Sequence, residues 1–238
     1  MVNLVSFSGG KDSTAMLLML LEKGVKIDDI IFCDTGKEFP DMLKHISEVE
    51  TYIGRSITKL TPQESFDYLF AHKQRKKGSK YENVVGYGWP DSLKRWCTGN
   101  LKTKTFNKYV RTKYGRDYTL FIGLASDEQK RFERNKDDRI KYPLVEWGVT
   151  EKEALEYCYS KGFYWNGLYK RFKRVSCYLC PLQRKCDWFT LKKYYPDLYE
   201  DALRLDKLSP YKFKVGITLE EQMDKWERKE LIKKGNKQ

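Results

Sequence analysis

The chain has 238 residues and carries 46 Lys and Arg against 33 Asp and Glu, which leaves a formal net charge of +13. No apolar run approaches the roughly eighteen residues of a membrane span, and no cationic leader precedes an apolar stretch, so we expect a cytoplasmic protein without membrane contact. The positive charge favours polyanionic partners. Nucleic acid is the first candidate, and a solvated basic surface is the alternative.

The first quarter of the chain alternates between short apolar strands and helices. Residues 2–7 (VNLVSF) predict a buried strand, and residues 12–23 predict a buried helix. A second strand is expected over 30–33, a helix over about 40–53 and a third strand over 56–60. This alternation indicates βαβ units, so the predicted fold class is α/β with a doubly wound, mainly parallel sheet.

The middle of the chain interrupts the alternation. Residues 72–95 predict an exposed, partly mobile basic loop, because lysines and arginines are followed there by glycines and a proline. Regular structure is expected to return with a helix over about 100–114, a strand over 119–123 and a helix over about 150–161. From about residue 187 onward the chain predicts amphipathic helices.

The segment SGGKDS, residues 8–13, lies at the carboxyl end of the first predicted strand and opens a helix. Glycines allow backbone N–H groups to approach phosphate oxygens, the helix N-terminus adds partial positive charge, and Lys11 adds a full charge. The spacing is neither that of a Walker A loop nor that of a GxGxxG fingerprint. The segment predicts a phosphate-binding loop, and a glycine-rich turn without a ligand is the alternative.

Together with five later segments, SGGKDS resembles the PP-loop of the ATP pyrophosphatases, which cleave ATP between its α- and β-phosphates. The segments are FCDTGKEFPDMLKHISEVE (32–50), RWCTGNLKTKTF (95–106), GLASDEQKRF (123–132), YPLVEWGVTEKEALEYCYSKGF (142–163) and LYKRFKRVSCYLCPLQ (168–183). They span roughly residues 4–186. Their order narrows the resemblance to the branch that contains phosphoadenylyl-sulfate (PAPS) reductases, the ATP sulfurylase small subunit and DndC-type DNA phosphorothioation proteins.

The resemblance implies that ATP binds at the carboxyl ends of the strands, with Lys11, Asp12 and Arg131 in catalytic roles and Mg²⁺ bridging phosphate oxygens with help from Asp12. The family motif Gly-Ile-Arg-x-x-Glu-Ser reads Gly-Leu-Ala-Ser-Asp-Glu here, with Ala125 in place of the arginine. The residues expected at the nucleotide are Ser6, Phe7, Ser8, Gly9, Gly10, Lys11, Asp12, Ser13, Asp34, Thr35, Gly123, Lys130 and Arg131.

On this basis we divide the chain into two parts. Residues 1–165 are expected to form the PP-loop nucleotide-binding domain. Residues 166–238 are expected to form a small cysteine-containing, helical extension packed on that domain.

Four of the six cysteines have a spacing typical of metal ligands. Cys177 and Cys180 form a C-x-x-C, Cys186 follows, and Cys97 precedes them. Four thiolates suit tetrahedral zinc or an iron–sulfur cluster. The resemblance favours a [4Fe-4S] cluster, because iron–sulfur members of the branch pair a cysteine of the RWCT-like segment with a later C-x-x-C; structural zinc is the alternative. The cysteines expected to be buried free thiols are Cys33 and Cys158.

Two classes of enzyme and one non-enzymatic class stay open. A sulfonucleotide reductase of this branch keeps its nucleophile in a C-terminal tail, and no cysteine follows Cys186. We therefore favour an enzyme that releases pyrophosphate from ATP and adenylylates an acceptor for sulfur incorporation. DNA or tRNA is the preferred acceptor, with a cysteine desulfurase or a larger complex as partner.

Sulfate is the small-molecule alternative as acceptor, as in the ATP sulfurylase small subunit. The non-enzymatic class is a nucleotide-binding subunit of a larger complex.

Overall fold

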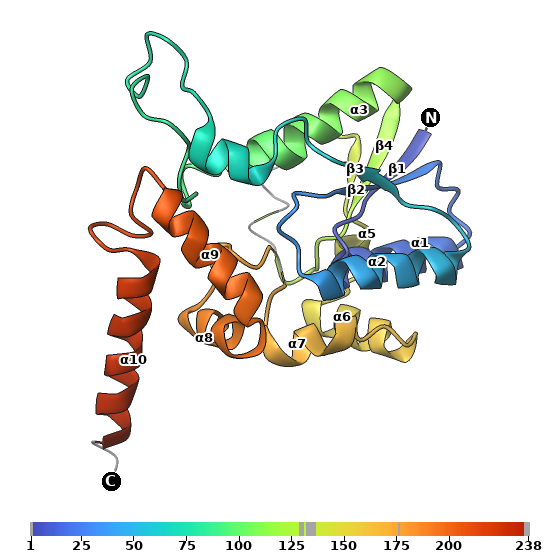
Figure 1. The fold of residues 1–238 in the computed structure, drawn as a ribbon. Coiled ribbons are helices and arrows are strands. Elements are labelled where there is room, and N and C mark those ends of the chain that lie inside the picture. The colour runs from blue at the N-terminus through green and yellow to red at the C-terminus, as the bar shows by residue number, and fades with distance from the viewer. Residues whose placement is uncertain (1, 129–130, 132–136, 176, 236–238) are drawn as a thin grey trace.

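The computed structural model describes residues 2–128, 131, 137–175 and 177–235. Within them lies one sheet of five strands in the order β3-β2-β1-β4-β5, and every neighbouring pair is parallel (Figure 1). The strands are β1 (Val2–Ser6), β2 (Asp29–Cys33), β3 (Thr58–Leu60), β4 (Tyr118–Ile122) and β5 (Ile140–Lys141). The predicted α/β class with a parallel sheet is confirmed.

Helices cover both faces of the sheet (Figure 1). Along β2, Ile30 and Phe32 enter the large core, whereas Ile31 between them faces a smaller cluster with Val110, because successive strand residues point to opposite faces. Val110 belongs to α3 (Lys104–Tyr114), which covers the smaller cluster. The large core lies under α1 (Lys11–Glu22) and α2 (Pro40–Ile53), and α6 (Glu151–Ser160) packs against α1.

The bounds of α2 and α6 follow from local chemistry. Helix α2 begins with Pro40 in its first turn and ends at Gly54, which has φ 63°, so the prediction over 40–53 is confirmed. Helix α6 begins with a capping box, in which the Thr150 side chain and the Glu153 side chain each bind the other residue's backbone N–H.

The structure differs from two predictions for the middle of the chain. The predicted helix over 100–114 consists of a π-helical segment, η2 (Thr98–Thr103), followed by α3. The basic loop begins after a second π-helical turn, η1 (Tyr68–His72), and its later part is not exposed as predicted. Trp89 is buried there and donates a 2.6 Å hydrogen bond to Asp206, because aromatic side chains of the loop find apolar partners in the C-terminal helices.

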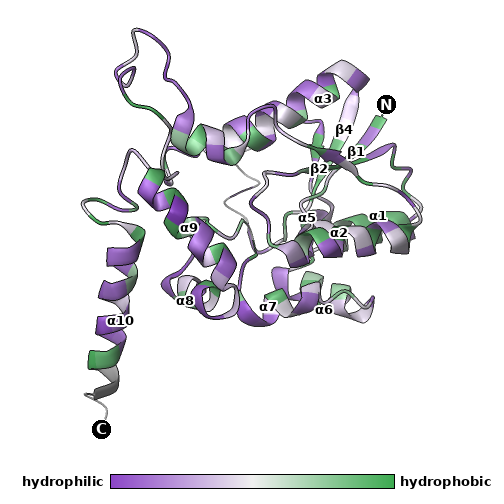
Figure 2. Ribbon diagram, viewed as in Figure 1, coloured by the Kyte–Doolittle hydropathy of each residue, from purple (hydrophilic) through white to green (hydrophobic). Residues whose placement is uncertain are grey.

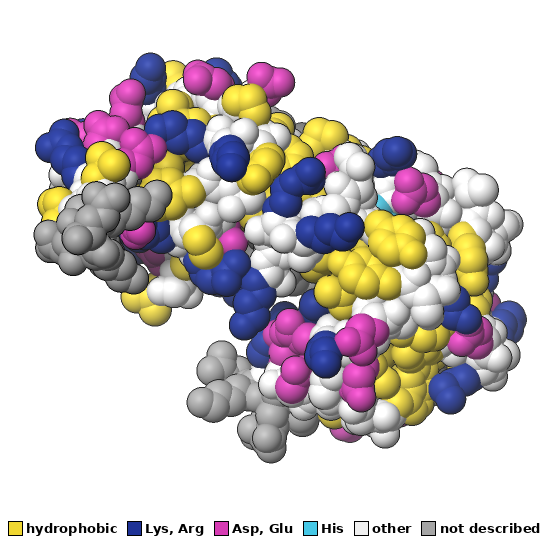
Figure 3. Space-filling model, turned by 90° about the horizontal axis from the view of Figure 1, so that it is seen from below, with side chains coloured by type: hydrophobic (Ala, Val, Ile, Leu, Met, Phe, Trp, Pro, Cys, Tyr) yellow, Lys and Arg dark blue, Asp and Glu magenta, His cyan; other side chains and the backbone are white. Residues whose placement is uncertain are grey.

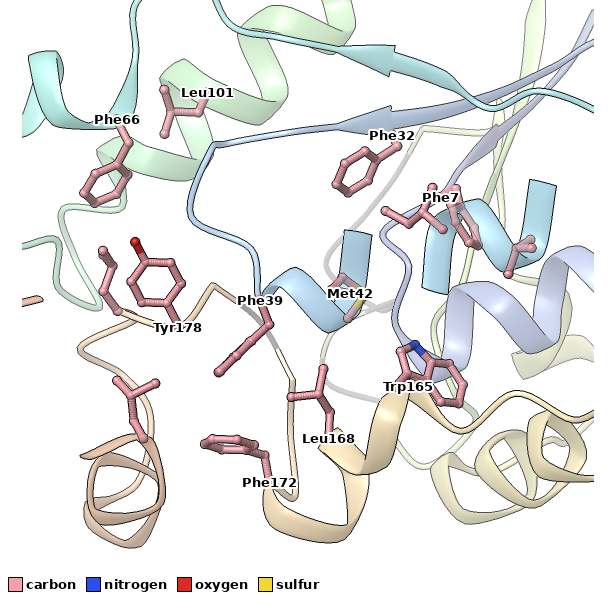
Figure 4. Close-up of a cluster of buried hydrophobic side chains, with 14 of the residues drawn as sticks. Phe7, Phe32, Phe39, Met42, Phe66, Leu101, Trp165, Leu168, Phe172 and Tyr178 are labelled. Carbon is pink, nitrogen blue, oxygen red and sulfur yellow. The ribbon is translucent and has the colours of Figure 1, made fainter. Parts of the chain in front are cut away.

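The C-terminal helices share the large core with the sheet. Figure 4 shows Phe39, at the start of α2, between Phe172 and Tyr178, and its ring centroid lies 5.1 Å from that of Phe172. The same cluster continues to Trp188 and Met223, so apolar contacts cross the proposed boundary after residue 165. The remaining elements are α5 (Pro143–Glu146), η3 (Trp165–Gly167), α7 (Leu168–Arg171), α8 (Lys185–Tyr194), α9 (Pro196–Leu208) and α10 (Leu219–Gly235).

Helix α10 extends away from the rest of the chain and is predominantly hydrophilic (Figure 2). None of the helices in the described part of the chain is both long enough and apolar enough to cross a membrane.

Candidate functional site

The predicted phosphate loop lies where the strand order reverses, between the carboxyl ends of β1 and β4, which is where open parallel sheets bind ligands. Gly123 follows β4 and packs directly on the first turn of α1: a Cβ at this position would lie 2.6 Å from both the N and the Cα of Ser13. Gly9 has φ 75°, and a Cβ there would lie 2.6 Å from Sδ of Met42. Glycine is therefore required at 123 by the close approach of backbone and at 9 by the positive φ.

Hydrogen bonds within the segment close the loop. The N–H of Ser8 donates to Oγ of Ser13 at 3.2 Å, and the two hydroxyl oxygens lie 3.0 Å apart. The Ser13 hydroxyl also donates to the carbonyl of Gly10 at 3.0 Å. The loop is thus a preformed turn whose ends are joined by its serines.

A distant segment braces the loop from outside. The indole N–H of Trp165 donates to the carbonyl of Gly9 at 2.7 Å, and the backbone N–H of Lys11 donates to Oη of Tyr169 at 2.9 Å. The Cys158 thiol donates to the carbonyl of Lys11 at 3.4 Å. Trp165 has φ 46°, a backbone conformation that bulky residues rarely adopt and that concentrates at functional sites.

The buried side chain of His45 contacts both Trp165 and helix α1. The His45 ring stacks on Trp165 with centroids 4.2 Å apart, and Nε2 lies 3.0 Å from Oγ1 of Thr14. Burial lowers the pKa of His45 to about 3, so the ring is neutral at physiological pH. It therefore contributes packing and a hydrogen bond to the first turns of α1, and no charge.

Lys11 is buried among carboxylates. Its Nζ lies 2.9 Å from both carboxylate oxygens of Asp12 and 3.0 Å from Oε2 of Glu151. Burial raises the pKa of Asp12, while the neighbouring Lys11 opposes that shift. This arrangement places a cation for phosphate beside carboxylate oxygens of the kind that Mg²⁺ prefers.

The loop opens into a cavity of about 280 Å³. Six of the predicted nucleotide residues line it, which brings the ends of β1 and β4 together as expected. These six are Ser8, Gly10, Lys11, Asp12, Gly123 and Arg131. Arg131 is exposed and forms an ion pair with Glu128, which lines the same cavity.

The other predicted residues lie around this cavity or outside the described residues. Ser6 ends β1, and the Phe7 side chain is buried in the large core. Asp34 accepts a hydrogen bond from the N–H of Gly36, so it caps the turn after β2. Lys130 lies outside the described residues.

Thr35 forms hydrogen bonds with the carboxylate of Glu38, which was not among the predicted site residues. Its hydroxyl lies within 2.9 Å of both carboxylate oxygens of Glu38, and its N–H donates to Oε2 at 3.1 Å. Burial raises the pKa of Glu38, although Lys102, with Nζ 3.7 Å from Oε1, opposes the shift. Glu38, after β2, and Lys102, in η2, both line the cavity, so these two segments add one acidic and one basic side chain to it.

Sequence reasoning missed several lining and bracing side chains of this site. Each comes from a segment outside the glycine-rich loop, and only folding shows which way it points. They include Glu38, Lys102, Glu151, Tyr169 and Arg174. The segment matches over 32–50, 95–106, 142–163 and 168–183 were the available signals for these five, and they did not single out these positions.

Two of the four predicted metal ligands are in contact with each other, a third interacts with one of them electrostatically, and the fourth lies elsewhere. The Cys177 thiol hydrogen-bonds to Cys180, and this contact lowers the pKa of Cys180 to about 6; Cys97 interacts electrostatically with Cys180. Cys177 also lines the cavity of the phosphate loop. Cys186 is exposed in the first turn of α8, beside Glu227 and Leu231 of α10.

The described residues therefore do not assemble the four-thiolate set that was predicted. Among them, no group of three or more His, Cys, Asp or Glu side chains is arranged to hold a metal ion. Of the two cysteines expected to be buried free thiols, Cys158 is fully buried, whereas Cys33 at the end of β2 is half-buried.

The chain is similar to known sequences. The sequence profile of the family described as "Phosphoadenosine phosphosulfate reductase domain" matches residues 3–183. Two similar proteins come from Methanocaldococcus jannaschii. "Uncharacterized protein MJ0066" is 30% identical over 83% of this chain and 40% of its own length. "Uncharacterized protein MJ0973" is 27% identical over 82% of this chain and 45% of its own length. The nin region protein ORF290 of Escherichia phage lambda is 32% identical over 65% of this chain and 58% of its own length. The chain thus spans less than half of each archaeal relative.

Two solved structures are similar as well. The phosphoadenylyl-sulfate reductase of Candida auris is 16% identical, with a TM-score of 0.49 over 74% of this chain and 82% of that one. The U34-tRNA thiolase NcsA of Methanococcus maripaludis, a structure with its [4Fe-4S] cluster, is 17% identical, with a TM-score of 0.43 over 87% and 72%.

Proposed function

We propose, from the premise that this chain belongs to the phosphoadenosine phosphosulfate reductase domain family, that it uses ATP to adenylylate a nucleic acid for sulfur incorporation. The observation that carries the proposal is that Lys11 of the loop and Cys177 of the C-x-x-C line the same cavity. One cavity therefore joins a phosphate-binding group and a sulfur-bearing group, as an enzyme that activates an acceptor and then sulfurates it requires.

In the first step, an acceptor oxygen attacks the α-phosphorus of ATP. The bond from that phosphorus to the oxygen it shares with the β-phosphate breaks, and pyrophosphate leaves. Lys11, Lys102 and Arg131 bring positive charge to the cavity, where they would stabilise the charge that grows on the leaving group. The Asp12 carboxylate would help to hold Mg²⁺, which would supply positive charge to the phosphates.

In the second step, a sulfide sulfur attacks the activated centre, and AMP leaves with the acceptor oxygen. Cys97, Cys177 and Cys180 are the cysteines nearest to one another among the predicted ligands of a [4Fe-4S] cluster or zinc, but in the described part of the chain they are not arranged to hold a metal ion. Because the described residues do not complete a metal site, we route no step through a metal centre. A cysteine desulfurase, together with a thiol reductant that supplies the two electrons needed to release its persulfide sulfur as sulfide, is the kind of partner that would supply the sulfur.

One observation keeps a sulfonucleotide reductase as the second candidate. A reductase needs a cysteine nucleophile near its nucleotide, and Cys177 lines the cavity of the phosphate loop. The hydrogen bond with Cys180, together with burial, raises the pKa of Cys177 well above its usual range. This shift disfavours the thiolate form that the attack of a reductase requires.

Release of pyrophosphate from ATP distinguishes these functions. We expect release that depends on Mg²⁺ and is stimulated by added tRNA or DNA. Release stimulated by sulfate alone would instead identify an ATP sulfurylase-like enzyme. Reduction of adenylyl sulfate without any pyrophosphate release would identify a reductase. Binding of ATP without turnover under every condition would leave a nucleotide-binding subunit.

A further inference from the structure

The positive charge of the chain is concentrated in one segment. Residues 73–116 contain thirteen Lys and Arg but only two acidic residues, Glu82 and Asp91, so they carry eleven of the thirteen net charges of the chain. The segment forms the basic loop, η2 and α3, which lie together along one side of the molecule (Figure 1). On the face seen from below in Figure 3, acidic and basic side chains are interspersed. Residues 73–116 are therefore the strongly basic part of the sequence.

A groove of about 450 Å³ lies beside α3 on this side. Its apolar lining includes Leu60, Pro62 and Leu69, which come from β3 and the segments that follow it. Lys104 and Lys108 line it from α3, one helical turn apart and both exposed. In the described part of the chain neither lysine forms an ion pair. The groove thus combines an apolar surface with two cations that are available to a ligand.

Amide and hydroxyl groups complete the lining. The side chains of Gln63 and Asn100 border the groove, as do those of Thr61 and Thr112. Amides suit the hydrogen-bonding edges of a nucleobase, and hydroxyls at the rim suit a ribose 2′-OH. The volume lies in the range of about 300–1,000 Å³ typical of small-ligand pockets, so a single unstacked nucleoside would fit.

The groove is connected to the phosphate loop by η2. Asn100 of η2 lines the groove, whereas Lys102, two residues later, lines the cavity of Lys11. The Cys33 thiol, at the end of β2, lies 3.8 Å from the carbonyl of Lys102, so η2 adjoins the strand ends of the site. A strand held in the groove would therefore pass close to the phosphate loop.

We propose that this groove binds an unpaired nucleotide of single-stranded RNA, with the base against Leu60 and Pro62 and the flanking phosphates on Lys104 and Lys108. The inference rests on the proposed function, for which it specifies the acceptor: an unpaired segment of RNA. Apolar contact supplies affinity for an unpaired base, and the lysines supply the salt-dependent part. The rim hydroxyls favour RNA over DNA.

The test measures binding without ATP, so its outcome is separate from that of the turnover assays. Fluorescence anisotropy would follow a labelled single-stranded RNA of about twelve nucleotides binding to the full chain at several salt concentrations. The test variant is Lys104→Gln with Lys108→Gln. The matched control is Lys44→Gln with Lys152→Gln, which removes the same charge from α2 and α6, where both lysines are exposed.

We expect the Lys104→Gln, Lys108→Gln double variant to bind RNA about tenfold or more weakly than wild type. The slope of log affinity against log salt concentration should become smaller in magnitude by roughly 1.4. The control double variant should change the affinity for RNA by less than about twofold. DNA of the same sequence should bind more weakly than RNA. A 2-aminopurine within the RNA should change its fluorescence on binding, and Thr112→Trp, which fills the groove, should abolish that change. ATP affinity should stay the same in every variant.

Equal losses of RNA affinity in the two double variants would overturn the proposal, because they would indicate general attraction of RNA to a basic protein. DNA or duplex RNA binding as tightly as single-stranded RNA would also overturn it. Weaker ATP binding in the α3 pair would assign the groove to the nucleotide of the phosphate loop. If the RNA results hold while pyrophosphate release fails, the proposed function alone is wrong.

Discussion

The indole N–H of Trp165 holds the carbonyl of Gly9 at 2.7 Å, across 156 residues of sequence. Trp165 is fully buried and lies in the left-handed region of backbone conformation, so the surrounding packing must hold it there. This contact connects the turn before α7 to the phosphate loop. It makes the geometry of the loop depend on a segment far along the chain.

Replacing Trp165 with Phe keeps a ring but removes the donor. The buried carbonyl of Gly9 then lacks its partner, which costs about 1–3 kcal/mol of unfolding free energy. We expect ATP affinity, measured by titration calorimetry, to fall several-fold as well. The control Trp226→Phe changes a partly buried tryptophan that packs on Phe189 far from the loop. Equal ATP affinity in the two variants would show that the brace does not position the loop.

The close approach of Gly123 to α1 allows a sharp steric test. Gly123→Ala brings a methyl group to 2.6 Å from backbone atoms of Ser13, so either β4 or the first turn of α1 must move. We expect a lower melting temperature and weaker ATP binding. Gly99→Ala is the matched control, because nothing lies within 4 Å of its added Cβ. Crystals of the variant with an unmoved α1 and full ATP affinity would contradict the expectation.

Lys11→Ala tests the charge in the phosphate loop. Removing a cation that stabilises the leaving pyrophosphate should lower the rate of its release by about 100-fold or more, with the fold retained. Lys152→Ala removes an exposed lysine on α6 and should leave the rate unchanged. Glu151→Gln, which weakens one partner of Lys11, should have a smaller effect than Lys11→Ala. Full turnover in Lys11→Ala would exclude the loop as the catalytic site.

Substitutions of single cysteines can separate the two proposed steps, pyrophosphate release and sulfur incorporation. Cys177→Ser should retain ATP-dependent pyrophosphate release but lose sulfur incorporation, because the proposed chemistry uses sulfur only after activation. Cys186→Ser should retain both, since Cys186 lies at α8 and α10, outside the cavity. Measured iron, acid-labile sulfide and zinc in each variant test the four-ligand prediction. Loss of metal in Cys186→Ser would restore Cys186 as a ligand.

Asp201 makes stability depend on pH in the acid range. Burial raises its pKa, but hydrogen bonds from Lys37, Tyr178 and Arg204 outweigh this and lower the pKa from 3.8 to about 2. The carboxylate therefore contributes about 2 kcal/mol above pH 4, and this contribution is lost as the pH falls toward 2. Urea unfolding should find Asp201→Asn less stable than wild type at pH 7, with the difference shrinking below pH 4. A constant difference would contradict the assignment.

Local patterns were enough to predict the sheet and the phosphate loop. Alternating apolar runs and helices predict a parallel sheet, and the position of SGGKDS between β1 and α1 identifies its carboxyl edge, since both features depend on neighbours in the chain. Helix α2 was predicted to the residue because Pro40 and Gly54 mark its ends.

Tertiary structure alone decided which distant groups meet at the loop. Neither the brace from Trp165 and Tyr169 nor the pairing of Lys11 with Glu151 has a local signal, because each depends on how α6 and α7 pack on α1. The sequence determined that C-x-x-C brings Cys177 and Cys180 together, since two intervening residues limit their separation. It could not determine the position of Cys186, because the start of a new helix turns that thiol toward α10 and away from the cavity.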